Sequence, residues 1–308
     1  MVLLLLGGCA GDDEGEPRAA SSTTTTTTTS VSTTAPTTTT TAATTTTTTT
    51  VPGPPVAAGD PAGLAEQIRS AEQTIRSDGR PPAEVAAAGH LQQVVYRQLS
   101  RHPEWDGAVR AALPAELADV AVDHAEAARG LAADVGAPRE NVPAWRIVEP
   151  APADELIGHY QAAAAEFGLA WEYLAGIHLV ETRMGRIRGT STAGAQGPMQ
   201  FLPGTWEAYG EGDINSNRDS IRAAARYLRS LNGHVDMHRA LRSYGGRNAV
   251  RYANAVTTYA QNMQADPRTF GGYYGWQVYY LSVAGDLWLQ VGYDEPVEVP
   301  VEEYLSRE

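Results

Sequence analysis

Apolar residues recur at helical spacing through most of the chain. Leu64, Ile68, Ala71 and Ile75 fall at i, i+4, i+7 and i+11, which is the period of one buried face of an α-helix. Val94, Val95 and Leu99 repeat the theme, and prolines interrupt it at Pro81, Pro82, Pro103 and Pro114. Residues 60–149 are therefore predicted to form a helical region of three or four helices.

A second helical stretch follows a Pro-containing linker at 141–152. The pattern predicts helices over 154–167 and 170–181, separated by Gly168, and a later helix over 219–231 with Asp219 as its N-cap. Arg222, Arg226 and Arg229 share one face of that later helix, which is typical of a solvated face.

The C-terminal segment changes from helical to alternating spacing. Residues 276–280 and 287–291 alternate on either side of a turn at 284–286, which predicts a small β-hairpin. Its many aromatic residues are more typical of packing than of a ligand platform. The predicted fold class is mainly α, with a helical region at 60–149, a second helical domain at 150–265 and an aromatic hairpin and tail at 266–308.

The N-terminal part has a different composition from the rest. Residues 21–50 are almost entirely Thr and Ser, and such a tract cannot bury enough apolar surface to offset its ordering entropy. We expect a disordered stalk over 9–59, closed by the stiffer Pro-rich piece at 51–55.

Charge and cysteine content exclude several classes of protein. The formal net charge of -13, with arginine as the only basic residue type besides histidine, argues against a nucleic-acid binder that relies on a broad positive surface. Cys9 is the single cysteine, so neither an intramolecular disulfide nor a cysteine metal cluster is possible.

The position of Cys9 suggests lipidation. A short apolar run leads into Leu6-Gly7-Gly8-Cys9, which resembles the lipobox of bacterial lipoproteins. That resemblance implies a truncated lipoprotein signal at 1–8, an acylated Cys9 and an extracytoplasmic body anchored to the membrane and facing the cell wall. The alternative is a truncated secretory signal with an incidental cysteine.

Glu181 continues the buried stripe of its predicted helix. Ala170, Leu174, Ile177 and Glu181 fall at i, i+4, i+7 and i+11. Burial and a helix C-terminus both disfavour a negative charge, so the pKa of Glu181 should be raised towards that of a proton donor near neutral pH. The alternative is a structural glutamate paired with one of the nearby arginines, Arg183, Arg186 or Arg188.

The loop that follows contains glycines, which would let a ligand or another part of the backbone come close to it. Gly194, Gly197 and Gly204 remove side chains where a ligand or another backbone must come near. Gln200 offers a donor and an acceptor, suited to the amide or hydroxyl groups of a neutral sugar. The loop lacks the spacing of a phosphate-binding loop.

Acidic and amide residues alternate at Asp213, Asn215, Asn217 and Asp219, which invites a calcium-loop interpretation. A calcium loop of the EF-hand type would want Gly at 218 and Glu at 224, where this chain has Arg218 and Ala224. The prediction is a polar loop that caps the next helix, and neither a metal nor a cofactor is predicted.

Four segments in order resemble one family. "VETRMGR", "GAQGPMQFLPGTW", "SIRAAARYLRSLNG" and "ALRSYGGRNAVRYANAV" look like the catalytic-helix end, signature loop, packing helix and Tyr-bearing segment of bacterial lytic transglycosylases. These are the goose-lysozyme-like SLT enzymes, and the first segment is similar to their membrane-bound B-type members. The resemblance covers residues 151–260 and implies a lysozyme-like α-helical catalytic domain.

The resemblance assigns roles to single residues. Glu181 matches the single catalytic acid/base of the family. Substrate-binding roles are implied for Ser191, Gln200, Tyr244, Gly194 and Gly197. In particular, Ser191 would lie near the N-acetyl group and Tyr244 would approach the catalytic carboxylate. The family often has Asn where this chain has Gly245, and Thr190 could replace Ser191 in its role.

The implied activity is cleavage of the MurNAc-GlcNAc β-1,4 bond of peptidoglycan glycan strands with formation of 1,6-anhydro-MurNAc ends. Ordinary glycosidases use two carboxylates, whereas the stretch from Thr182 to Trp206 contains none. A muramidase that admits water is one alternative. A non-catalytic peptidoglycan-binding lipoprotein is another, and an adhesin or solute-binding lipoprotein is a third.

Overall fold

The computed structural model of the chain describes residues 53–246 and 249–307. The predicted lipidation site at Cys9 and residues 9–52 of the predicted stalk lie outside the described residues. The prediction of a disordered stalk is wrong for its last part, 53–59, because the Gln67 side chain accepts a hydrogen bond from the backbone N–H of Ala58 and donates one to the carbonyl of Val56. The described part is mainly α-helical, as the apolar spacing predicts, and its strands are short antiparallel pairs. Within it, no helix is both long and apolar enough to cross a membrane.

The N-terminal helices follow the proline breaks of the sequence. They are α1 (Pro61–Ile75), α2 (Pro82–Arg101), the 3-10 helix η1 (Pro103–Trp105), α3 (Asp106–Ala112) and α4 (Ala115–Val135). Asp60 caps α1, since its side chain accepts hydrogen bonds from the backbone N–H groups of Ala62 and Gly63. The predicted helical region of three or four helices is confirmed.

The central helices are α5 (Ala153–Phe167), α6 (Trp171–Thr182), α7 (Pro203–Tyr209), α8 (Asn217–Ser230), α9 (Met237–Tyr244) and α10 (Val250–Ala265). Three of the six central helices, α5, α6 and α8, lie within two residues of the bounds predicted from the sequence, and no bounds were predicted for the other three. The prediction of Asp219 as an N-cap is wrong. The cap is Ser216, whose side chain accepts from the backbone N–H of Asp219, so α8 begins two residues earlier than predicted.

The remaining elements are short. They are α11 (Thr269–Tyr274), α12 (Val301–Leu305), β1 (Asn141–Val142), β2 (Arg146–Ile147), β3 (Ile187–Arg188), β4 (Val278–Ser282), β5 (Gly285–Leu289) and β6 (Val299–Pro300). The predicted hairpin is confirmed as β4 paired with β5, but its turn lies at 283–284, between the paired Ser282 and Gly285, and not at 284–286 as predicted. The predicted linker at 141–152 contains two strands, because β1 pairs with β6 and β2 pairs with β3.

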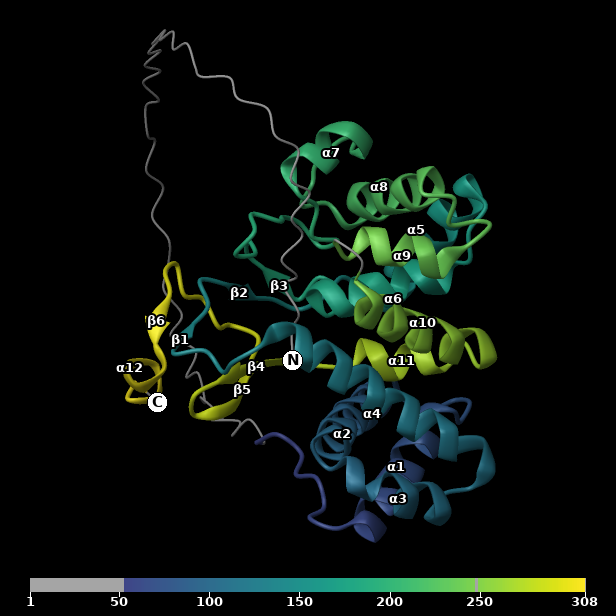
Figure 1. Ribbon diagram of the computed structural model, residues 1–308, viewed down its shortest axis with the longest axis vertical. Coiled ribbons are helices and arrows are strands. Elements are labelled where there is room, and N and C mark those ends of the chain that lie inside the picture. The colour runs from purple at the N-terminus through teal and green to yellow at the C-terminus, as the bar shows by residue number, and fades with distance from the viewer. Residues whose placement is uncertain (1–52, 247–248, 308) are drawn as a thin grey trace, which may run out of the picture. The chain divides into compact units, whose positions relative to one another are not determined.

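Helix α10 lies between the N-terminal helices and the rest of the helical body. It packs against α4 on one side and α6 on the other, and Figure 1 shows it in this central place. Helix α2 also packs against α4 and α11. One hydrophobic cluster runs through all these helices and includes Leu64, Leu99, Leu174 and Val256, none of which is exposed. The helical region therefore shares its core with the helices that follow it.

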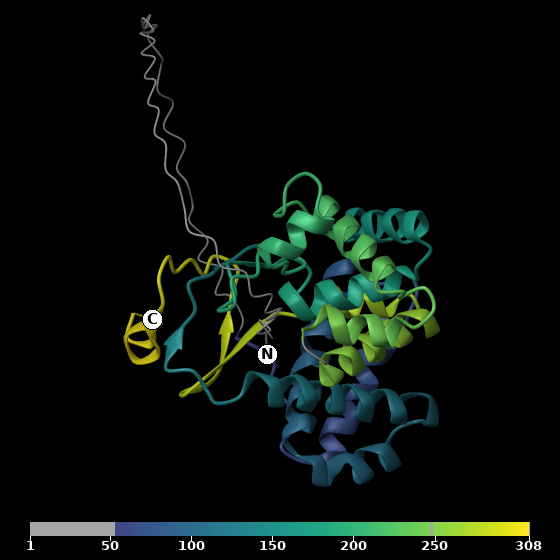
Figure 2. The ribbon, with the colours of Figure 1, turned by 45° about the horizontal axis from the view of Figure 1, so that its top comes forward.

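The strands enclose a second, smaller cluster. It joins residues from β1, β2, β3 and the hairpin to residues near the C-terminus: Val142, Trp145, Ile147, Ile187, Val278, Leu289, Tyr293, Val299 and Val301. Figures 1 and 2 both place these strands to one side of the helices. Because β3 begins five residues after the end of α6, this cluster fixes the path of the chain that leaves Glu181.

Candidate active site

Glu181 is the penultimate residue of α6, and its side chain is only 3% exposed. The helix is buried on all sides from Leu174 to Thr182, which agrees with the burial predicted from the apolar stripe. Removing the carboxyl from water disfavours its charged form and raises the pKa of Glu181 from 4.5 to about 8. At neutral pH this side chain is therefore mainly a carboxylic acid.

A single tyrosine binds the carboxyl group. The hydroxyl of Tyr252 on α10 donates a hydrogen bond to Glu181 Oε1 at 2.8 Å, which partly offsets the rise in pKa because it favours the charged form. Since Oε1 accepts this bond, Oε2 is left available to carry the acid proton.

The predicted alternative, a salt bridge from a neighbouring arginine, is not found among the described residues. Arg183 donates to the carbonyl of Leu179 and lies over the Trp276 ring. Arg186 binds Glu149 and the carbonyl of Tyr274, and Arg188 binds the carbonyl of Asn215. No arginine is therefore in place to stabilise the carboxylate form of Glu181 and lower its pKa.

The chain leaves α6 through a left-handed turn. Arg183, Met184 and Gly185 have φ angles of 52°, 60° and 79° in succession. Such angles strain residues with side chains and persist where surrounding contacts impose them. Thr182 supplies one such contact, because its hydroxyl donates to the carbonyl of Pro198 at 2.6 Å and accepts from the backbone N–H of Gly185. Helix α6 is thereby joined to the glycine-containing loop.

The tip of that loop is a tight backbone turn. Gln196 and Phe201 exchange two backbone hydrogen bonds, at 2.9 and 2.8 Å. A Cβ at Gly197 would lie 2.0 Å from the carbonyl oxygen of Ile214, so the close approach there comes from another backbone. Gly194 has a φ of 82° and open space around it. Neither glycine lines the pocket at Glu181.

Ser191 is buried within the loop. Its hydroxyl oxygen accepts hydrogen bonds from the backbone N–H groups of Ala193 and Ala195, at 3.2 and 2.9 Å. Ser191 is absent from the residues that line the pocket at Glu181. In this structure the serine fixes the conformation of the loop.

Gln200 does line the pocket at Glu181. Its φ of 51° is left-handed, and its side-chain Nε2 donates to the carbonyl of Gly197 at 2.9 Å. That bond orients the amide so that Oε1 is buried without a hydrogen-bond partner among the described residues. A buried acceptor without a donor is uncommon in folded proteins and is typical of a position that a ligand completes.

Tyr244 lines the same pocket, but its hydroxyl donates to the carbonyl of Met199 at 2.9 Å. Its ring is parallel to that of Tyr252, with centroids 6.4 Å apart and an interplanar angle of 5°. Tilted ring contacts continue from Tyr244 to Tyr227, at an interplanar angle of 40°, and from Tyr227 to Tyr209, at 38°. Tyr244 therefore lies between the tyrosine that binds the acid and a row of further aromatic rings.

Tyr252 was not predicted as a site residue from the sequence. A signal was available, since Tyr252, Val256, Tyr259 and Met263 recur at i, i+4, i+7 and i+11 and are all buried. That stripe has the same spacing as the stripe that contains Glu181. A tyrosine on such a buried helix face carries a hydroxyl that needs a hydrogen-bond partner, although the spacing alone does not identify that partner.

The polar loop before α8 binds its own backbone. The carboxylate of Asp219 accepts from the backbone N–H of Asp213 at 3.1 Å, and that of Asp213 accepts from the backbone N–H of Asn215. This is the helix-capping loop of the prediction. Within the described residues, no three carboxylate, imidazole or thiol groups come together as a metal site.

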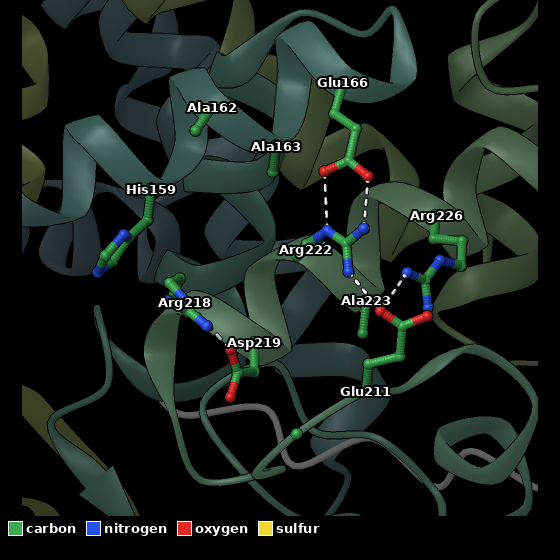
Figure 3. Close-up of a pocket in the computed structure, with 11 residues that line it drawn as sticks. His159, Ala162, Ala163, Glu166, Glu211, Arg218, Asp219, Arg222, Ala223 and Arg226 are labelled. Carbon is green, nitrogen blue, oxygen red and sulfur yellow. Dashed lines mark hydrogen bonds and ion pairs between the residues drawn. The ribbon is translucent and has the colours of Figure 1, made fainter.

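A larger cavity of about 430 Å³ lies between α5 and α8. Figure 3 shows its charged groups bound to one another: Arg222 is held between Glu166 and Glu211, and Arg226 also binds Glu211. These arginines form the solvated face predicted from the sequence. The mutual pairing in this cavity leaves its charges compensated.

The comparison with protein families identifies the domain that contains Glu181. Residues 159–265 match the model of the transglycosylase SLT domain. Neither the curated proteins nor the solved structures contain a match to this chain. The match spans α6, the glycine-containing loop and α10, and thus the whole pocket at Glu181. The chain therefore carries a transglycosylase SLT domain, the domain of peptidoglycan-cleaving lytic transglycosylases.

Proposed function

We propose that this protein is a lytic transglycosylase that cleaves the MurNAc-GlcNAc β-1,4 bond of peptidoglycan and leaves 1,6-anhydro-MurNAc ends, with Glu181 as its single acid/base. One observation carries the proposal. Glu181 is buried, its pKa is raised to about 8, and it is the only carboxylate among the described residues that line its pocket. A glycosidase with two carboxylates would present a second acid across the scissile bond.

The chemistry uses the same carboxyl group twice. Protonated Glu181 gives its proton from Oε2 to the glycosidic oxygen as the C1–O bond breaks, and the N-acetyl group of the substrate stabilises the positive C1. The resulting carboxylate then removes the proton of the C6 hydroxyl while O6 forms a bond to C1. The proton count of Glu181 is thereby restored, and an intramolecular hydroxyl replaces water as nucleophile.

Gln200 is proposed to position the sugar. Gln200 lines the pocket and its Oε1 is buried without a hydrogen-bond partner among the described residues, so an N–H or O–H group of the substrate is proposed to complete it. The rings of Tyr244 and Tyr227 offer flat apolar surfaces beside it. Ser191 is proposed to support this site through the loop rather than to bind the sugar, because its hydroxyl accepts two backbone bonds.

Product analysis tests the reaction. Purified protein is incubated with murein, and the soluble fragments are separated and weighed by mass spectrometry. We expect fragments one water lighter than those released by a muramidase on the same murein, and their absence after Glu181→Gln exchange. Fragments with hydrolysed, reducible ends would indicate a muramidase, and murein binding without fragments would indicate a non-catalytic binding protein.

We further propose that Cys9 is acylated and anchors the domain to the outer face of the cell membrane, opposite the cell wall. The support is the sequence Leu6-Gly7-Gly8-Cys9, with a Thr/Ser tract between it and the folded part. We expect the expressed protein to partition into the detergent phase of a Triton X-114 extract and the Cys9→Ala variant to remain in the aqueous phase. Equal partitioning of the two would contradict the anchor.

A further inference from the structure

The loop that carries Gln200 is held by its backbone carbonyls. Those of residues 197–199 each accept a hydrogen bond from a side chain, in order from Gln200 Nε2 at 2.9 Å, the Thr182 hydroxyl at 2.6 Å and the Tyr244 hydroxyl at 2.9 Å. We call these three groups the carbonyl triplet. Because each peptide unit is planar and all three carbonyls are bonded, the backbone that leads into Gln200 has little freedom to rotate.

Two of the three bonds come from outside the loop. Thr182 is the last residue of α6, directly after Glu181, and Tyr244 is the last residue of α9. Within the described residues, the other hydrogen bonds of residues 196–201 stay inside that segment. Thr182 and Tyr244 are therefore the hydrogen-bond ties that join the carbonyl triplet to helices α6 and α9.

Thr182 does not line the pocket at Glu181 itself. It is fully buried, and it is absent from the residues around that pocket. Its hydroxyl proton is used in the bond to the carbonyl of Pro198, and its oxygen accepts from the backbone N–H of Gly185 at 3.1 Å. Any effect of this hydroxyl on a reaction in the pocket must therefore pass through the segments that it binds.

Gln200 needs such a tie because its backbone is strained. Its φ of 51° is left-handed, a conformation that a residue with a side chain keeps only where surrounding contacts impose it. Its Oε1 is buried without a hydrogen-bond partner among the described residues. A backbone free to relax would move this acceptor, and a misplacement of about 1 Å can cost a reaction about 100-fold in rate.

We propose that Thr182 is a positioning residue for glycan cleavage, whose bond to the carbonyl of Pro198 holds the Gln200 amide at a fixed place in the pocket at Glu181. The inference rests on the proposed function, in which Gln200 Oε1 accepts from an N–H or O–H group of the sugar. Because Thr182 directly follows Glu181 on α6, one short link sets the acid and the sugar-binding amide relative to each other.

Two exchanges that differ by a single oxygen test the proposal on the full chain. Thr182→Ala and Thr182→Ser lose the same methyl group, but only the serine keeps the hydroxyl. We expect kcat/KM for murein cleavage to fall at least about tenfold in Thr182→Ala and to stay within about threefold of the wild type in Thr182→Ser. Equal rates in the two variants would overturn the proposal. If Thr182→Ala does not fold, Thr182→Val takes its place, since it lacks the hydroxyl but keeps the volume of the side chain.

A double-mutant cycle with Gln200 separates positioning from general support of the fold. Gln200→Met removes both polar atoms of the amide at a nearly constant volume. If Thr182 acts through Gln200, Thr182→Ala should cost less than about threefold in the Gln200→Met background, against at least about tenfold in the wild type. Equal costs in the two backgrounds would contradict the assignment, because the hydroxyl would then act elsewhere, as through its bond to Gly185.

Thr269→Ala is the matched control. Thr269 is also buried, and its hydroxyl also donates to a backbone carbonyl, that of Asp266 at 2.8 Å, but it lies on α11 outside the pocket at Glu181. We expect Thr269→Ala to lower the melting temperature, as Thr182→Ala does, without reducing the rate of cleavage. An equal loss of cleavage in both would overturn the proposal, because lost stability alone would then explain it.

Murein binding keeps this test apart from the proposed reaction. In the Glu181→Gln background, co-sedimentation with insoluble murein measures binding without turnover, and Thr182→Ala should weaken it at least about threefold while Thr269→Ala leaves it unchanged. A wild type that binds murein but releases no anhydro fragments would contradict the proposed reaction alone. Equal binding with and without the Thr182 hydroxyl would contradict the positioning role alone, and no binding in any variant would overturn both.

Discussion

The pocket at Glu181 and the charged cavity between α5 and α8 contain the same residue type in opposite electrostatic states. Hydrogen bonds from Arg222 lower the pKa of Glu166, and hydrogen bonds from Arg226 and Arg222 lower the pKa of Glu211. Burial raises the pKa of Glu181 to about 8. The first two acids remain charged at neutral pH, and only the third can donate a proton.

The cavity that holds the ionised acids is also much the larger of the two. The charged cavity measures about 430 Å³ and the pocket at Glu181 about 40 Å³. In the larger one the carboxylates and arginines are paired with one another, as Figure 3 shows. In the smaller one Glu181 has no ion-pair partner among the described residues, and Gln200 Oε1 has no hydrogen-bond partner there. The comparison indicates that a buried acid with a raised pKa, or a buried polar atom without a hydrogen-bond partner, points to a candidate active site better than cavity volume does.

The largest expected effect is on catalysis by the Glu181→Gln variant. The amide is nearly isosteric and can still accept the hydrogen bond of Tyr252, but it cannot transfer a proton. We expect the rate of murein cleavage to fall at least about 10³-fold, as for the loss of a general acid. The rate of fragment release from labelled murein measures it, and a decrease below about tenfold would remove Glu181 from its proposed role.

The next largest expected effect is a loss of stability when the loop that carries Gln200 is changed. In Gly197→Ala the new Cβ would lie 2.0 Å from the carbonyl oxygen of Ile214, and alanine is strained at a φ of 74°. We expect a loss of at least about 3 kcal/mol in the free energy of unfolding. Gly194→Ala is the matched control, because its φ of 82° is also left-handed but its surroundings are open.

Gly194→Ala should lower the free energy of unfolding by only about 1 kcal/mol, because alanine there meets the strain of the left-handed conformation but no steric contact. Chemical denaturation of both variants gives the two values. If they were equal, contact with the Ile214 backbone would not be what requires glycine at position 197.

A third effect concerns stability against pH. The pKa of Glu181 is about 8 in the folded protein and near 4.5 when the chain is unfolded, so the folded state binds the proton more tightly. The wild type should therefore lose stability as pH rises from about 4.5 to about 8. Glu181→Gln removes this loss and should be about 3 kcal/mol more stable at pH 7.

Denaturation of both proteins at pH 4 and pH 7 checks this expectation. The difference in the free energy of unfolding between wild type and variant should be small at pH 4, where the glutamate is mainly protonated in both the folded and the unfolded state. A difference that did not change with pH would mean that Glu181 is not the group whose pKa is raised.

These comparisons also show how far the sequence could predict the molecule. The burial of Glu181 and the bounds of α6 follow from local helical periodicity, and they were predicted to within a residue. The bond from Tyr252 and the contact of Gly197 with Ile214 join residues far apart in the chain. Local spacing carries no information about such pairs.

Smaller errors have the same origin. Ser216 and Asp219 can both cap a helix, and the choice depends on backbone angles that composition does not fix. The strands within 141–147 are two residues long each and depend on partners at 187–188 and 299–300. Pairing between distant short segments leaves no periodic signal in either one.

A subtler change tests the environment of the acid. Tyr252→Phe removes the hydrogen bond that favours the charged form of Glu181, so the pKa of Glu181 should rise above its value of about 8. The alkaline limb of the pH profile of kcat/KM, which reports the acid in the free enzyme, should move to higher pH. A shift to lower pH would contradict the assigned hydrogen bond.

The smallest expected effect comes from the charged cavity itself. In Glu166→Gln, Arg222 keeps its bond to Glu211, and Glu166 is a surface acid on α5 outside the pocket at Glu181. Exposed ion pairs contribute little to stability, so we expect murein cleavage and the melting temperature to equal those of the wild type within error. This is the same Glu-to-Gln exchange as at Glu181, applied to an acid that is already ionised and paired. A large loss of cleavage in Glu166→Gln would mean that the paired cavity, rather than the unmatched acid, is where the substrate binds.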